Sequence, residues 1–154
     1  MVTVGLEPFD SADATRLRED QSVELGSRYG DDNPEPGTPL RAQDVPFFVV
    51  ARDADGTPVG CGGLRMLAPD LAEIKRMYVV PAHRGTGVAT AILRELESLA
   101  VAAGVERLVL ETGPLQPEAM RFYQREGFES IENFGPYVGA EQSVCFGRTL
   151  VGRP

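Results

Sequence analysis

The sequence predicts an α/β protein whose central sheet is mixed and covered by helices on both faces. Short apolar runs bounded by Gly, Pro or Asp are typical of strands, and they recur along the chain. Between them, the segment 85–103 carries apolar residues at spacings of four, four, three and four, which is typical of an amphipathic helix. A chain of 154 residues with 42% apolar residues can bury one core, so we expect a single domain over residues 1–154.

The first half of the chain predicts a strand, a helix and a three-stranded meander. Residues 2–6 alternate with period two, as a short edge strand does. Asp10 or Ser11 can cap a helix over about 12–26. The apolar runs that follow predict strands at 47–51, 59–66 and 71–80, with a turn at 53–56.

A long loop is predicted between the first helix and the meander. Residues 30–46 hold four prolines and several acids and show no periodicity. Loops of this length in compact domains are often lids or binding segments. A loop that covered the site would favour a small substrate, and a plain surface excursion explains the composition equally well.

The second half predicts strands that alternate with helices. Gly104 is a natural stop for the helix at 85–103. Since a strand, this helix and another strand follow one another within 72–111, we expect the two strands to lie parallel. The remaining predicted elements are a strand at 107–112, a helix at 117–126 and strands at 128–131 and 143–150.

Composition excludes several classes of function. Asp plus Glu total 23 against 15 Lys plus Arg, and a net charge of −8 disfavours nucleic acid as a partner. The same charge attracts cationic small molecules weakly, although solubility alone also explains it. We see neither a membrane-length apolar run nor a signal peptide. Cys61 and Cys145 lie in apolar strands without metal-ligand spacing, so we expect buried thiols, a cytoplasmic location and no metal.

The most informative segment is a glycine-rich turn that joins a strand to a helix. Arg84, Gly85 and Gly87 precede the first helical residues. Free N–H groups at a helix N-terminus bind anions, glycine allows close approach of a phosphate, and arginine adds a positive charge. A tight connection without a ligand is the alternative interpretation. The turn is neither a Walker loop nor a dinucleotide-binding fingerprint.

Two spaced motifs give this turn a family resemblance. Arg84-x-x-Gly87-x-Ala89 matches the R/Q-x-x-G-x-G/A signature of GNAT-type N-acetyltransferases. Downstream, the segment 119–128, AMRFYQREGF, resembles the A-x-x-(F/L)-Y-x-x-x-G-F segment of that family. One predicted strand separates the two motifs, as in the family. The chain is identified as a member on residues 47–130.

The resemblance implies a GNAT fold, with a mostly antiparallel sheet splayed between its fourth and fifth strands, here 72–79 and 107–112. Acetyl-CoA is then the cosubstrate and enters the splay. Gln116 stands where the family often has Asn, so it either contacts the cosubstrate or only adjoins a helix start. The implied cofactor-binding residues are Met77, Tyr78, Val79, Arg84, Gly85, Thr86, Gly87, Val88, Ala89, Thr90 and Gln116.

The resemblance also implies catalytic roles. Tyr123 occupies the position of the tyrosine that protonates the departing thiolate, and packing beneath the cofactor is the alternative. Glu73 is the expected general base if it is buried, or a solvated strand-end carboxylate if it is not. Glu111 is a second candidate base. His83 is expected in an exposed turn.

Three aromatic residues have expected structural roles. Phe122 and Phe128 are expected to pack in the core. Residues 134–146 resemble a family region in which a loop closes one wall of the acceptor site. Tyr137 therefore either contacts substrate or anchors that loop.

The expected activity is acetyl transfer to the primary amine of a small molecule by direct attack in a ternary complex. A protein or peptide acceptor is an alternative, and so is a non-catalytic module that binds acetyl-CoA. Family members often pair, so a homodimer is a further expectation that the sequence leaves open. No membrane partner is expected.

Overall fold

The computed structural model describes residues 1–30 and 39–150. The predicted loop over 30–46 therefore lies partly outside the described residues. From residue 39 onward it contains one 3₁₀ turn, Ala42–Asp44, which leads into the first strand of the meander.

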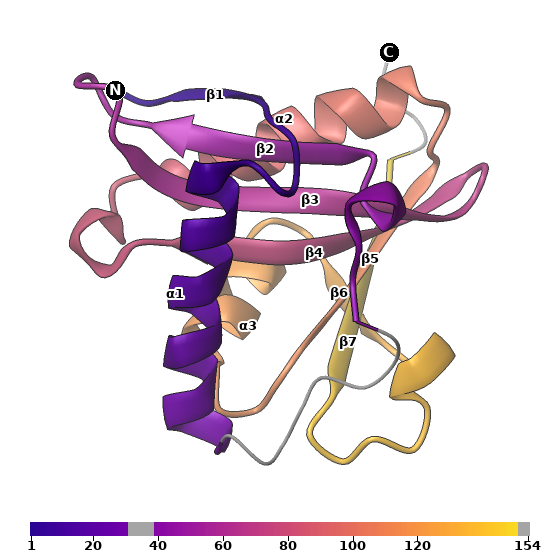
Figure 1. Ribbon diagram of the computed structural model, residues 1–154. Helices are drawn as coiled ribbons and strands as arrows, with labels where there is room; N and C mark the ends of the chain where they lie inside the picture. Colours follow the sequence, from indigo (N-terminus) through magenta and orange to yellow (C-terminus); the bar gives the residue numbers. More distant parts are fainter. Residues whose placement is uncertain (31–38, 151–154) are drawn as a thin grey trace.

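Within the described residues, seven strands form one sheet in the order β1-β2-β3-β4-β5-β7-β6 (Figure 1). Neighbouring strands are antiparallel except β4 and β5, which are parallel. The predicted α/β class and the predicted parallel pair are thus confirmed. The strands are β1 (Thr3–Leu6), β2 (Phe47–Arg52), β3 (Pro58–Ala68), β4 (Leu71–Val79), β5 (Arg107–Thr112), β6 (Glu129–Ile131) and β7 (Val144–Thr149).

Helices cover both faces of the sheet, as predicted. Helix α1 (Ala12–Tyr29) crosses one face and α2 (Val88–Ala102) lies behind the other, with the shorter α3 (Pro117–Arg125) below (Figure 1). Ser11 caps α1, because its Oγ accepts a hydrogen bond from the N–H of Ala14 at 3.1 Å. Among residues 1–30 and 39–150, no helix is both long enough and apolar enough to cross a membrane.

Two helix boundaries differ by more than one residue from those predicted. Helix α1 continues beyond residue 26 to Tyr29, where Gly30 ends it with a φ of 87°. Helix α2 begins at Val88 rather than at 85, because Gly85 and Gly87 hold left-handed backbone that cannot belong to the helix. The three residues before α2 form the turn that later matters for the site.

Separate clusters of apolar side chains fix the two helices. On the α2 side, Ile92 and Leu96 pack with the buried side chains of the central strands. On the α1 side, Ala14 and Leu17 pack with Phe48 and neighbouring residues. Both predicted buried cysteines are buried free thiols, Cys61 in the α1 cluster and Cys145 in β7.

The sheet opens where β4 and β5 separate. The two strands pair only from Leu71 opposite Arg107 to Ile74 opposite Leu110, although β4 continues to Val79. The register between β3 and β4 also shifts there, so that Gly62 faces both Arg76 and Met77 in a β-bulge. The splay predicted between the fourth and fifth strands is therefore present.

Candidate active site

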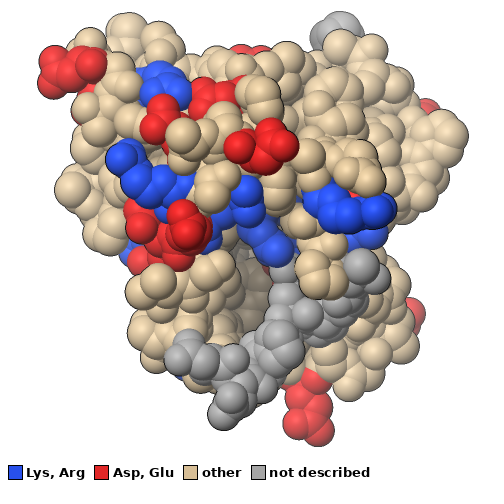
Figure 2. All heavy atoms as spheres, in the orientation of Figure 1, with Lys and Arg blue, Asp and Glu red and all other residues tan. Residues whose placement is uncertain are grey.

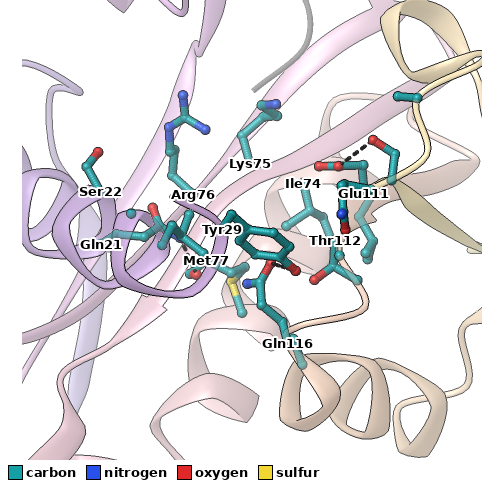
Figure 3. A pocket seen from close by; sticks show the side chains of 18 of the residues that line it. Gln21, Ser22, Tyr29, Ile74, Lys75, Arg76, Met77, Glu111, Thr112 and Gln116 are labelled. Atoms are coloured by element: carbon teal, nitrogen blue, oxygen red, sulfur yellow. Dashed lines mark hydrogen bonds between the residues drawn. The ribbon is translucent and has the colours of Figure 1, made fainter. Parts of the chain in front are cut away.

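Two adjoining clefts occupy the splay in the described part of the chain. The first, which we call the inner cleft, has a volume of about 640 Å³ and lies between β4 and β5. Its remaining walls come from the second half of α1, from α3 and from residues 140–143 (Figure 3). The second, the glycine cleft, lies between residues 83–90 and α3, with a volume of about 580 Å³.

The glycine turn has the geometry of an anion site. Gly85 and Gly87 have φ values of 77° and 89°, and a Cβ built on either would meet no atom within 4 Å. Gly87 is the N-cap of α2 and provides no side-chain cap, so the first N–H groups of the helix have no partner from that position. An open approach and a helix N-terminus suit a phosphate-bearing cosubstrate.

Most of the residues predicted to bind the cosubstrate border the glycine cleft. The exceptions are Val79, Thr86 and Gln116. The Val79 carbonyl accepts a hydrogen bond from Arg84, the Thr86 hydroxyl donates one to the His83 carbonyl, and Gln116 borders the inner cleft instead. Those bordering the glycine cleft are Met77, Tyr78, Arg84, Gly85, Gly87, Val88, Ala89 and Thr90.

Arg84 borders the glycine cleft, and its side chain also has two hydrogen-bond partners within the protein. Its Nε donates to the carbonyl of Val79 at 2.9 Å, and its terminal nitrogen donates to Glu24 of α1 at 2.7 Å. The side chain therefore links α1 to the glycine turn, and part of its charge is already balanced by a carboxylate. His83, expected to be exposed, is half-buried at the border of the same cleft.

Tyr123 stands at the junction of the two clefts. It borders both, as do Met77 and Ala119, and only 6% of its surface is exposed. Burial raises the pKa of the phenol, so the hydroxyl keeps its proton well into the alkaline range. A buried phenol that reaches both clefts can donate a proton to a group lying between them.

The two phenylalanines near Tyr123 differ in burial. Their rings meet the tyrosine edge-on, at 5.1 Å for Phe122 and 5.4 Å for Phe128. Phe128 is buried, as predicted. Phe122 packs against the core but is only half-buried and borders the glycine cleft, so it differs from the expected core residue.

Glu73 is buried, with 2% exposure, in a polar network with Tyr137 and Lys75. The hydroxyl of Tyr137 donates to its Oε2 at 2.6 Å, and Lys75 Nζ lies 3.6 Å from the same oxygen. Lys75 in turn donates to the Tyr137 hydroxyl at 2.8 Å. Glu73 is not among the described residues that border either cleft. Tyr137 thus anchors its loop to β4, which was one of its two expected roles.

Glu111, the second candidate base, borders the inner cleft. The pairing of β5 with β4 ends at Leu110, so Glu111 is the first residue of β5 that has no partner on β4. The hydroxyl of Ser143 donates to its Oε2 at 2.8 Å and fixes the carboxylate on the β5 side of the cleft (Figure 3).

Helix α1 supplies cleft residues that the motifs did not predict. Gln21 Nε2 donates to the carbonyl of Met77 at 2.9 Å, and the Tyr29 hydroxyl accepts from the N–H of Leu115 at 2.9 Å. That hydroxyl also lies 3.4 Å from the amide oxygen of Gln116. No local signal in the sequence marked these side chains.

Comparison with known proteins decides the family. The model of the acetyltransferase (GNAT) family matches residues 13–128, which include the glycine turn and Tyr123. The chain belongs to the GNAT family. This confirms the expected fold and the expected enzyme class, an acyltransferase whose family cosubstrate is acetyl-CoA.

Three similar proteins illustrate the range of this GNAT chain's relatives. An IAA acetyltransferase of Azospirillum brasilense is 38% identical over 99 residues, which cover 64% of this chain and 63% of that protein. A solved structure from Klebsiella pneumoniae is described as that of a proposed acyl-CoA N-acyltransferase. It superposes with a TM-score of 0.82 at 27% sequence identity, and the match covers 97% of this chain and 98% of that chain. A GNAT acetyltransferase of Elizabethkingia anophelis with acetyl-CoA bound shares the fold, with a TM-score of 0.70, 18% identity and coverage of 97% and 98%.

Proposed function

We propose that this protein transfers the acetyl group of acetyl-CoA to the primary amine of a small molecule, by direct attack in a ternary complex. The observation that carries the proposal is the position of Tyr123, which borders both clefts. With the cosubstrate in the glycine cleft and the amine in the inner cleft, the reacting groups would meet beside one buried proton donor.

The glycine cleft would hold the cosubstrate through backbone groups. The first turn of α2 would receive the phosphates, with Arg84 adding a charge-assisted contact. Within the described residues, β4 has no β5 partner from Lys75 to Val79, so its backbone is available to an extended ligand on that side. A backbone N–H of this stretch would stabilise charge that develops on the acyl oxygen.

Glu111 and Tyr123 would exchange the protons of the reaction. Glu111 would take a proton from the attacking ammonium or amine, directly or through water, while the new C–N bond forms and the C–S bond breaks. Tyr123 would give its proton to the departing sulfur. Glu73, the base expected from the sequence, would instead position the wall of the cleft, because it is bonded to Tyr137 and borders neither cleft.

A small acceptor is favoured by the shape of the inner cleft. Helix α1 and residues 140–143 enclose it on two sides, and a volume of about 640 Å³ is in the range of small-molecule sites. The Azospirillum relative is named for IAA, a small molecule. A peptide acceptor would need an open groove.

Thiol release from acetyl-CoA tests the proposal with a panel of small primary amines and a matched panel of peptides. We expect release only when an amine is present, with small amines preferred, and the Glu111→Gln variant to lose activity more than Glu73→Gln at equal folded fraction. Binding of acetyl-CoA without release for any acceptor would favour the non-catalytic alternative. Preference for peptides would overturn the small-molecule assignment.

A further inference from the structure

The β-bulge in β4 places two consecutive cations on the same side of the sheet. In a regular strand successive side chains alternate between faces. Here Ile74 and Met77 both pack with the core on the α2 side, whereas Lys75 and Arg76 lie between them. Both cations border the inner cleft, and Figure 3 shows them extending to the same side of it.

The backbone of Arg76 is held in a conformation that its residue type disfavours. Its φ is 61°, and it is the single non-glycine residue with a positive φ in the described part of the chain. Such conformations persist where the surroundings impose them, and they concentrate at functional sites. Here Arg76 lies at the bulge and borders the inner cleft, so the residue with the unfavourable backbone also places a cation at the cleft wall.

The opposite wall of the inner cleft carries a negative charge. Glu111 follows Leu110, the last residue of β5 that is paired with β4, and Lys75 follows Ile74 in the same way. Both residues border the inner cleft at the start of the splay, with Arg76 next along β4. The cleft thus has a cationic β4 wall and an anionic β5 wall.

A second arginine lies near Arg76 on the β4 side. Arg18 of α1 is close enough to Arg76 that the pKa of Arg18 is lowered, first by burial and next by the charge of Arg76. The whole chain carries a net charge of −8, so a gathering of cations is not the general character of its surface. Figure 2 shows Lys and Arg side chains along the upper border of the hollow on this face.

We propose that the acceptor carries a carboxylate as well as its primary amine, as an amino acid does, with the carboxylate bound at Arg76 and the amine directed to Glu111. This inference rests on the function proposed above and deepens it. We assign the carboxylate to Arg76 rather than to Lys75, because the Lys75 ammonium donates to Tyr137 and its charge is partly offset by Glu73 at 3.6 Å. A guanidinium recognises a carboxylate through two parallel hydrogen bonds, which a lysine or an amide cannot reproduce.

Paired acceptors test the proposal directly. Each amino acid of a panel is compared with its own carboxamide, which keeps the amine and the side chain but has no negative charge. Thiol release from acetyl-CoA gives kcat and KM for each. We expect the carboxylate forms to have kcat/KM values about 10- to 100-fold higher, the range typical of a charge-assisted contact.

The Arg76→Gln variant identifies the residue responsible. Glutamine at position 76 has to adopt the same left-handed backbone as the arginine, so the backbone strain is unchanged and the fold should be kept. An unchanged KM for acetyl-CoA verifies this. We expect the carboxylate preference to fall at least about tenfold, mainly through KM of the acceptor, with carboxamides little affected. Arg16→Gln, which removes the same charge from an exposed position of α1 that borders neither cleft, should leave the preference intact.

The outcomes separate this inference from the function on which it rests. Equal turnover of amino acids and carboxamides would overturn the carboxylate assignment while leaving amine acetylation in place. The assignment would also be overturned if Arg76→Gln lowered kcat/KM equally for amino acids and for their carboxamides. If no amine were acetylated at all, the proposed function would fail and the inference would fail with it.

Discussion

The Tyr137 hydroxyl donates a 2.6 Å hydrogen bond to Oε2 of Glu73, a residue 64 positions earlier in the chain. Lys75 completes the group from the same strand as Glu73. The contact joins the loop that precedes β7 to β4, and residues 140–143 of that loop form a wall of the inner cleft. The shape of the cleft therefore depends on a buried polar cluster, of which only Lys75 among these three residues borders the cleft.

We predict that Tyr137→Phe destabilises the protein by about 1–3 kcal/mol, because it leaves a buried carboxylate and a buried ammonium without their shared hydroxyl partner. Denaturant unfolding measures the effect. Tyr29→Phe is the matched control: this tyrosine is only half-buried, so a smaller loss is expected. Equal losses of unfolding free energy in the two variants would mean that the Glu73–Tyr137–Lys75 cluster contributes no more than a half-buried hydroxyl does.

We predict that Tyr123→Phe lowers kcat by at least about tenfold and leaves KM for acetyl-CoA little changed, since general acid catalysis typically contributes 10²–10⁴-fold and water can substitute in part. The ring and its edge-on contacts remain. Steady-state thiol release under conditions where chemistry is rate-limiting provides the measurement. A phenylalanine variant with unchanged kcat would remove Tyr123 from the mechanism.

The pH profile gives an independent check on Tyr123. Burial raises the pKa of the phenol above its ordinary value of 10.0, so the donor stays protonated as the pH approaches that value. We therefore expect no loss of wild-type kcat from phenol ionisation below about pH 10. A basic limb in that range that disappears in Tyr123→Phe would contradict this.

We predict that Gly87→Ala weakens acetyl-CoA binding, whereas Gly104→Ala does not. Both glycines have left-handed φ values, 89° and 86°, and a Cβ at either meets no atom within 4 Å. Each substitution should therefore cost a similar backbone strain of about 1–2 kcal/mol. Only Gly87 borders the glycine cleft, so calorimetry should separate the two variants even where their melting temperatures agree.

We predict that the free energy of unfolding falls as the pH rises above 9, in part because of Cys61. Burial raises the pKa of this thiol from 9.0 to about 12. Above pH 9 the unfolded chain releases the thiol proton while the folded chain keeps it, so stability is full below 9 and is lost between 9 and about 12 at up to about 1.4 kcal/mol per pH unit. Cys61→Ala should show a shallower slope over that window in reducing buffer, and an unchanged slope would contradict the assignment.

Local sequence patterns predicted the elements and the glycine turn well, because strand and helix periodicity and positive-φ glycines are local properties. The start of α2 was placed three residues early, since periodicity alone does not show that Gly85 and Gly87 adopt left-handed backbone. The parallel pair followed from the order of elements, and the splay followed from the family motifs.

Features that depend on register and distant partners could not be predicted in the same way. Glu73 could be placed on a strand, but its burial against Tyr137 depends on how a loop 64 residues later folds back. The shared orientation of Lys75 and Arg76 depends on a bulge created by the pairing of β4 with β3. Two adjacent cations in the middle of a strand were the one available signal that this stretch departs from regular alternation.

Helix α1 has contacts with both arms of the splay. Gln21 bonds the carbonyl of Met77 on β4, and Arg28 donates to the carbonyl of Leu115, beyond the end of β5, at 3.0 Å. One rigid helix thus fixes the distance between the arms before any ligand arrives. A slot of preset width excludes molecules by thickness, so a slender unbranched chain can enter where a branched one of equal length and polarity would be stopped.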